Sequence, residues 1–234
     1  MTLPRLLLVL LLPAPFCAAG DAPAPRPSPL APQPLLSSWF TVQTNLQTWS
    51  ADFIQTRTFK SLTQPLVATG QVWFAEPNRF RWELGRPAQT IAVRAPDDLL
   101  IFYPRLKRVE KFPLTGQARG QWRDGLALLE AGFPRSEAAL LSRFQILSQV
   151  TSNSVCALTL QPKSPPARRL MPQIRIEFTT NTLELCATEL RFADGSTMRN
   201  DFQNGKLNPT LSSNLFNPPI DPAFKVVEPA KERK

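Results

Sequence analysis

Residues that could perform chemistry are sparse in this sequence, and histidine is absent from all 234 residues. Without an imidazole there is no Ser-His-Asp or Cys-His nucleophile system, no histidine-ligated zinc and no imidazole acid–base catalyst. Carboxylate-only, lysine-based and magnesium-assisted chemistry remains open. The single adjacent carboxylate pair, Asp97-Asp98, directly follows Pro96. That run is typical of a turn, whereas glycosidase carboxylates are expected on separate elements about 5–10 Å apart. The sequence therefore favours a non-enzymatic role with no catalytic residue, no metal site and no cofactor.

The charge balance is basic, with 27 Lys+Arg against 18 Asp+Glu and a formal net charge of +9. Such a surface suggests acidic partners, nucleic acid or anionic lipid. The charges are scattered, however, and the densest stretch, Arg105 to Lys111, alternates charged with apolar residues and includes Glu110. This pattern is typical of a solvated strand face, so we expect no nucleic-acid partner.

The first 20 residues have the layout of a secretory signal peptide, with Arg5, the apolar run 6–12 and small residues up to Gly20. The run is too short to span a bilayer, which needs about 20 apolar residues, and no later segment reaches that length. A lipoprotein signal that acylates Cys17 is the alternative, but the bulky Phe16 directly before it fits that pattern poorly. We expect export and cleavage after Ala19 or Gly20.

Composition divides the rest of the chain into three parts. Residues 21–35 contain six prolines, favour polyproline II and are expected to form a spacer. Residues 36–227 are expected to fold as one domain, and residues 228–234 form a charged tail.

Hydrophobic periodicity predicts one helix followed by many strands. Leu35, Trp39, Val42, Leu46 and Trp49 recur at helical spacing. Segment 121–141 is a helical insert, which Gly132-Phe133-Pro134 should break into two short helices. Strand-like runs separated by turn residues occur at 71–74, 79–84, 91–94, 99–103, 106–112, 143–150, 155–161, 173–178, 183–192 and 197–203.

These elements predict a mainly β (α+β) fold. We expect a single, strongly curved antiparallel sheet, or half-open barrel, of about ten strands, with the N-terminal helix and the short helical insert as a lid. Two interpretations of the concave side remain open: an ordinary packed core beneath two helices, or an apolar pocket with a helical lid. In the second, the pocket residues are Phe53, Val72, Phe74, Phe80, Trp82, Leu84, Ile91 and Val93, and the lid residues are Trp39, Val42 and Leu46.

After removal of the signal peptide, two cysteines remain, Cys156 and Cys186. In an oxidising compartment they could pair. The strand-like run 173–178 lies between them, however, and in a simple meander the outer strands would exceed the Cα separation of about 7 Å that a disulfide allows. A disulfide and two free thiols both remain open.

Several landmarks in order give the sequence a resemblance to a known family. The stretch from Ala68 to Glu83 has a glycine, an apolar strand, the turn Pro77-Asn78, then a strand with Phe80 and Trp82. This stretch resembles the outer-membrane lipoprotein carrier family, LolA. The other landmarks are Phe53-Ile-Gln55, Pro87, Leu100 to Pro104, Arg199 to Phe202, Leu215 to Pro219 and Lys225 to Val227.

The resemblance implies a half-open antiparallel barrel closed by helices, located in the periplasm. It implies acyl chains as cargo, an inner-membrane ABC transporter (LolCDE-like) that loads the carrier, an outer-membrane acceptor (LolB-like) and a monomeric state. In the best-known members an arginine directly before the Pro-Asn turn helps to hold the lid closed, and here that position is Glu76. The alternatives are a carrier of a non-lipoprotein amphiphile and a cell-envelope interaction or assembly module with a filled core.

Overall fold

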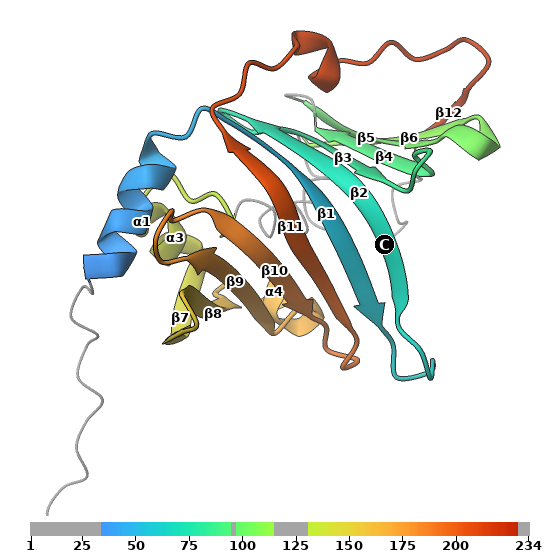
Figure 1. Cartoon of the computed structure of the whole chain (residues 1–234). Helices are drawn as coiled ribbons and strands as arrows, with labels where there is room; N and C mark the ends of the chain where they lie inside the picture. Colours follow the sequence, from blue (N-terminus) through green and yellow to red (C-terminus); the bar gives the residue numbers. More distant parts are fainter. Residues whose placement is uncertain (1–33, 95–96, 115–130, 229–234) are drawn as a thin grey trace, which may run out of the picture. The chain divides into compact units, whose positions relative to one another are not determined.

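The computed structural model describes residues 34–94, 97–114 and 131–228 (Figure 1). Residues Pro32–Lys234 form one compact unit. The predicted signal peptide, residues 21–33 of the spacer, residues 229–234 of the tail and the first part of the helical insert lie outside the described residues.

One curved sheet dominates the described chain, as the sequence predicted (Figure 1). It has 12 strands in the order β12-β6-β5-β4-β3-β2-β1-β11-β10-β9-β8-β7, and the two edge strands, β12 and β7, are not paired with each other. The strands are β1 (Thr48–Thr58), β2 (Leu66–Ala75), β3 (Arg79–Leu84), β4 (Thr90–Arg94), β5 (Asp98–Tyr103), β6 (Arg108–Pro113), β7 (Phe144–Ser152), β8 (Val155–Pro162), β9 (Gln173–Thr179), β10 (Leu185–Arg191), β11 (Thr197–Leu207) and β12 (Lys225–Val227).

The ten predicted strand segments correspond to β2–β11, and the sheet adds β12 and the full length of β1. Strand β1 lies in the middle and pairs with β2 on one side and β11 on the other. The sheet therefore has two halves, which we call the β2–β6 wing and the β7–β11 wing. All neighbouring pairs are antiparallel except the short β12, which pairs with β6 in parallel.

The first helix is shorter than predicted. Helix α1 (Pro34–Thr44) ends where the Asn45 side chain donates a hydrogen bond back to the Thr41 carbonyl. The Asn208 carboxamide then accepts from the Gln47 backbone N–H at 2.8 Å, which fixes the chain at the entry to β1. Trp49 consequently lies on β1, so its assignment to the helical stripe was wrong.

Two further α-helices and two 3-10 turns complete the described elements. The second predicted helix of the insert corresponds to α3 (Glu137–Arg143), which the Ser136 side chain caps by accepting from the Ala139 N–H. The others are α4 (Pro165–Leu170), η1 (Pro104–Leu106) and η3 (Ser213–Phe216).

The main hydrophobic core lies under α1, on the concave face of the β7–β11 wing. Trp39 of α1 is fully buried and stacks on Phe178 of β9, with ring centroids 4.8 Å apart. Figure 1 shows α1 and α3 on the same side of this wing. The inner side chains of the wing are largely aliphatic and fully buried: Leu158, Leu160, Ile174 and Ile176.

A second cluster lies on the opposite face of the β2–β6 wing. Val93, Phe102 and Val109 are buried there and pack against Phe224, in the C-terminal segment that leads to β12. Both faces of this wing are therefore apolar over part of their area. Alternation of apolar and polar residues alone cannot tell there which face is the inner one.

Candidate functional site

An apolar cavity of about 280 Å³ lies on the concave side of the sheet. Ligand pockets typically measure roughly 300–1,000 Å³, so this cavity is at the lower end of that range. Its walls come from β1–β5, β10, β11 and the segment that precedes α3. The lining residues are Trp49, Gln55, Val72, Phe74, Asn78, Phe80, Trp82, Ala92, Arg94, Leu99, Ile101, Gly132, Phe133, Leu185, Thr188, Leu190, Met198, Asn200 and Phe202.

Aromatic rings form the wall nearest to β1. Trp82 contacts Phe53 with centroids 4.1 Å apart and meets Phe202 edge-on at 6.3 Å. Phe202 is in turn edge-on to Trp49 at 5.1 Å. Tilted and edge-on aromatic pairs are favourable, and unfilled space remains beside these rings. These rings therefore bound the cavity without closing it.

The position of Phe53 depends on a glycine. A Cβ atom at Gly70 would lie 2.2 Å from Phe53 Cζ and 2.2 Å from the Glu83 carbonyl oxygen. The register places Gly70 directly opposite both Phe53 and Leu84. The missing side chain therefore lets the Phe53 ring lie across β2 and reach Trp82.

A short loop, residues 132–135, covers one part of the cavity. Phe133 stacks on Phe74, with centroids 4.7 Å apart and planes at 9°, and packs on Trp49 at 4.9 Å. Gly132 and Phe133 belong to the lining. Part of the cover thus comes from the insert, as the sequence predicted, but through an aromatic side chain in a loop.

Arg135 ties this loop to the rest of the fold. Its guanidinium lies 3.4 Å from the Glu76 carboxylate and donates to the Pro77 carbonyl at 3.2 Å. Its own carbonyl accepts from the Thr44 hydroxyl at 2.9 Å. Glu76, which stands where well-known LolA proteins carry an arginine, is therefore paired with an arginine from the insert.

Five polar side chains interrupt the apolar lining: Gln55, Asn78, Arg94, Thr188 and Asn200. Three of them, Gln55 on β1, Asn200 on β11 and Thr188 on β10, are joined to one another by hydrogen bonds. Gln55 donates to Asn200 at 2.9 Å, and Asn200 donates to Thr188 at 3.2 Å. We call these three residues the polar row.

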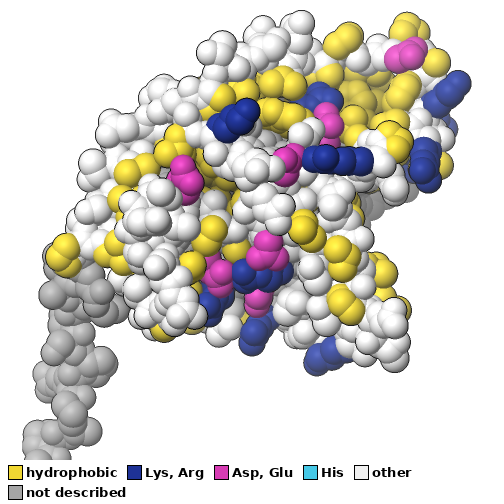
Figure 2. Space-filling model, in the orientation of Figure 1, with side chains coloured by type: hydrophobic (Ala, Val, Ile, Leu, Met, Phe, Trp, Pro, Cys, Tyr) yellow, Lys and Arg dark blue, Asp and Glu magenta, His cyan; other side chains and the backbone are white. Residues whose placement is uncertain are grey.

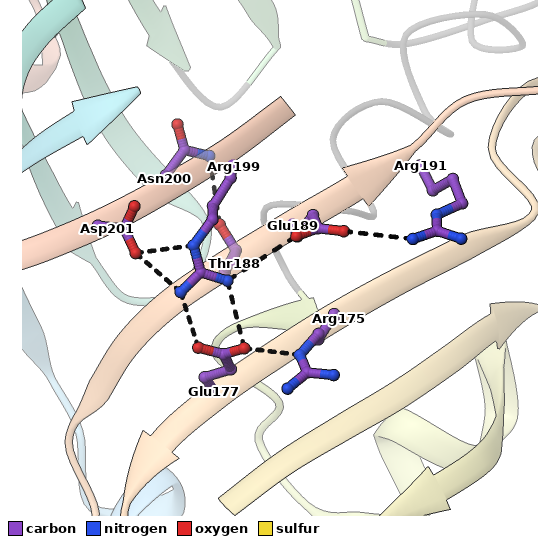
Figure 3. Close-up of polar contacts among 8 residues, drawn as sticks. All are labelled: Arg175, Glu177, Thr188, Glu189, Arg191, Arg199, Asn200 and Asp201. Atoms are coloured by element: carbon purple, nitrogen blue, oxygen red, sulfur yellow. Dashed lines mark hydrogen bonds and ion pairs between the residues drawn. The ribbon is translucent and has the colours of Figure 1, made fainter. Parts of the chain in front are cut away.

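The outer face of the same strands carries a charged network (Figure 3). Arg199 makes two hydrogen bonds to Glu177, at 3.2 and 2.8 Å, and one to Asp201 at 2.8 Å. Hydrogen bonds from Arg199 hold the pKa of Glu177 below its ordinary value, and Glu177 raises the pKa of Arg199. Figure 2 shows acidic and basic side chains intermixed on the face in view. The network links β9, β10 and β11 on the side away from the cavity.

The structure brings four of the eight predicted pocket residues to the cavity wall: Val72, Phe74, Phe80 and Trp82. Phe53 lies directly behind Trp82, and Leu84 packs against the main core.

The predicted placement of Ile91 and Val93 on the concave face was wrong. Phe80 pairs with Arg94 and Trp82 with Ala92, so Ala92 and Arg94 face the cavity. Val93 is buried in the outer cluster, against which Ile91 packs.

The predicted lid residues also lie elsewhere. Trp39 and Leu46 are buried in the main core, Val42 is half-buried, and none of the three lines the cavity. Helix α1 fills the β7–β11 wing because Trp39 and Phe40 reach the aliphatic side chains of that wing.

Sequence reasoning missed several lining residues. Met198, Asn200 and Phe202 alternate along the predicted strand 197–203. The alternation that identified Trp82 as an inner residue would have identified these three as well. Trp49 was missed because its spacing placed it in the predicted helix. Phe133 was missed because it lies in a loop, where no periodic pattern marks an inner face.

Both described cysteines are free thiols, which resolves the open choice between them and a disulfide. Cys156 on β8 and Cys186 on β10 are separated by β9. Burial raises the pKa of both thiols, so both stay protonated at neutral pH.

None of the helices in the described part of the chain is long and apolar enough to cross a membrane. Likewise, the described side chains include no group of three or more His, Cys, Asp or Glu that could hold a metal ion.

A curved, unclosed β-sheet with an apolar cavity on its concave side defines a class of hydrophobic-ligand binding folds. Comparison with known proteins gives the family. The sequence matches the family described as outer membrane lipoprotein carrier protein LolA over residues 44–219, and the chain belongs to this family.

One curated relative is the outer-membrane lipoprotein carrier protein of Chromohalobacter salexigens, which is 27% identical over 140 residues. The match covers 60% of this chain and 62% of the relative, which is less than two thirds of the relative's length.

Similar solved structures include an uncharacterized conserved protein from Thermus thermophilus, with a TM-score of 0.49 and 10% identity over 81% of this chain and 94% of that one. Another is the domain of a putative outer membrane lipoprotein-sorting protein from Vibrio parahaemolyticus, with a TM-score of 0.43 and 12% identity over 78% of this chain and 94% of that one.

Proposed function

We propose that this protein is a periplasmic carrier that holds the acyl chains of lipoproteins, or of a related lipid, in its cavity and ferries them from the inner to the outer membrane. Family membership and the apolar cavity support this proposal. The single observation that carries it is the set of aromatic and aliphatic side chains, among them Phe80, Trp82 and Phe202, that surrounds unfilled space on the concave face.

The physical need for such a carrier follows from the cost of exposing hydrocarbon to water. Burying each CH₂ group is worth about 0.8 kcal/mol, so a long acyl chain gains on the order of 10 kcal/mol by entering an apolar cavity. The cavity wall supplies apolar contacts, and the sheet needs no titrating group to do so. This fits the complete absence of histidine from the sequence.

The proposed route requires two partners. A LolCDE-like transporter of the inner membrane would load the carrier, and a LolB-like acceptor at the outer membrane would receive the cargo. The carrier itself would act as a monomer. The rival interpretation, an envelope interaction module with a filled core, fits less well because the interior next to Trp82 and Phe202 is not filled.

The test is a lipid analysis of natively exported protein combined with uptake of a fluorescent acyl probe. We expect organic extracts to contain acylated material, and Trp82→Asp to abolish probe uptake because it places a carboxylate in the aromatic wall. Trp73→Asp is the matched control, since Trp73 lies on the neighbouring strand and faces away from the cavity. Repeatedly empty extracts, together with no probe uptake, would refute the proposal.

A further inference from the structure

The polar row has no role in binding a bare hydrocarbon chain. Gln55 and Asn200 are only 6% and 4% exposed, yet both line the cavity. Buried polar groups are unfavourable in apolar surroundings unless they are hydrogen-bonded. A cavity for hydrocarbon alone would gain from apolar residues at these positions, so their presence needs a different explanation.

The register places the three side chains side by side. Gln55 is directly opposite Asn200, and Asn200 is directly opposite Thr188. Alternation sends their chain neighbours Arg199 and Asp201 to the outer face, where they form the charged network, and Figure 3 shows Asn200 beside that network with its contact to Thr188. The strands are therefore already held in register from the outer face.

The hydrogen bonds within the row leave an acceptor free at one end and a hydroxyl donor free at the other, beside the second N–H of each carboxamide. Gln55 uses its amide nitrogen to reach Asn200, and Thr188 uses its oxygen as an acceptor. Among the described residues, neither the Gln55 Oε1 atom nor the Thr188 hydroxyl hydrogen has a protein partner. One is an acceptor and the other a donor, and both belong to uncharged side chains on the cavity wall.

We propose that the polar row binds an uncharged group on the ligand that both donates and accepts, namely an amide or a hydroxyl. The inference rests on the proposed function and narrows its ligand class to acyl amphiphiles that bear such a group. An amide N–H donates to Gln55 Oε1 while the amide carbonyl accepts from the Thr188 hydroxyl. An ester can only accept, so it leaves Gln55 Oε1 without a partner, and a bare chain satisfies neither end of the row.

The experiment measures displacement of N-phenyl-1-naphthylamine by dodecanamide, methyl dodecanoate and dodecane. Gln55→Met removes the free acceptor and Thr188→Val removes the free hydroxyl donor while nearly keeping side-chain shape, and each also removes one hydrogen bond to Asn200. We expect each substitution to lower the affinity for dodecanamide relative to dodecane by about tenfold, because a neutral hydrogen bond contributes roughly that factor. Methyl dodecanoate, which cannot donate to Gln55 Oε1, should lose less affinity than dodecanamide on Gln55→Met. The control, Thr69→Val at an exposed position of β2, should leave every ratio unchanged.

The outcomes separate this inference from the function on which it rests. If the wild type binds all three ligands and neither substitution changes their ratios, the row only joins strands and the inference is wrong, while the carrier proposal stands. If no ligand displaces the probe from the wild type, both are wrong. Circular dichroism checks folding, and Thr188→Val decides alone if Gln55→Met does not fold.

Discussion

The two wings of the sheet are both built from antiparallel strands, but the side chains on their inner faces pack differently. In the β7–β11 wing, inner aliphatic residues such as Leu160 and Ile176 are fully buried under Trp39 of α1. In the β2–β6 wing, the inner residues Phe74, Phe80 and Trp82 are large rings that only the 132–135 loop partly covers among the described residues. Close packing needs complementary shapes as well as apolar surface. Helix α1 and strands β7–β9 can therefore provide stability, while the β2–β6 wing, together with β1, β10 and β11, surrounds space for a ligand.

The largest expected difference in stability comes from truncating Trp39, which packs on the β7–β11 wing, and Trp82, which belongs to the β2–β6 wing. Trp39→Ala should lower the free energy of unfolding by about 3–5 kcal/mol, because it empties a fully packed site. Trp82→Ala should cost clearly less, because one side of that ring already faces the cavity. Urea denaturation measures both, and equal losses would show that the wings do not differ in packing.

The next largest effect concerns the glycine under the aromatic wall. Gly70→Ala should destabilise the fold by about 1–3 kcal/mol, since the added methyl group would overlap Phe53 and the Glu83 carbonyl. Gly205→Ala on β11 is the matched control, because its Cβ would meet Trp49 Nε1 at an ordinary 3.7 Å. Thermal unfolding of the two variants compares them, and similar melting temperatures would contradict the role assigned to Gly70.

The charged network gives a smaller and pH-dependent effect. The pKa of Glu177 in the folded protein is below its ordinary value of 4.5, so its stabilising contribution is present above about pH 4.5 and is lost as the pH falls through the lowered value. Glu177→Gln should therefore cost about 1–2 kcal/mol at pH 7 and less at pH 3. Denaturation at both pH values tests this.

Glu228→Gln serves as the control for that series, because Glu228 is exposed. A loss for Glu177→Gln that is equal at pH 7 and pH 3 would show that the carboxylate charge does not stabilise β9, β10 and β11.

The smallest effect is expected where the loop meets the β2–β3 turn. Arg135→Glu should speed probe entry about 1.4- to fivefold, the range that corresponds to an exposed ion pair worth roughly 0.2–1 kcal/mol. Stopped-flow fluorescence measures the rate, and high salt should reduce the difference. The exchanged pair, Glu76→Arg with Arg135→Glu, should restore the slow rate, and no restoration would mean that the charges do not hold the loop.

The sequence predicted most of the fold because strand alternation and turn residues are local signals. It succeeded at Phe80 and Trp82, where charged residues alternate with aromatic ones and identify the inner face. It failed at Ile91 and Val93, because the C-terminal segment covers the outer face there and makes both sides apolar.

Other features of the site depend on contacts between distant parts of the chain. Asn200 becomes a cavity residue only through its pairing with Gln55, 145 positions earlier. Phe133 reaches Phe74 from a loop, and the Arg135–Glu76 pair joins that loop to a turn. No local pattern encodes such contacts, so only the folded chain reveals them.

The most direct test of the account is photolabelling with an acyl chain that carries a diazirine, followed by mass spectrometry of the labelled peptides. We predict labels on β2, β3 and β11 near Phe74, Trp82 and Phe202, which an excess of unlabelled acyl ligand suppresses. Labels in the β7–β9 core near Trp39 and Phe178, or spread over the surface and insensitive to competitor, would contradict the claim that the apolar cavity holds the ligand.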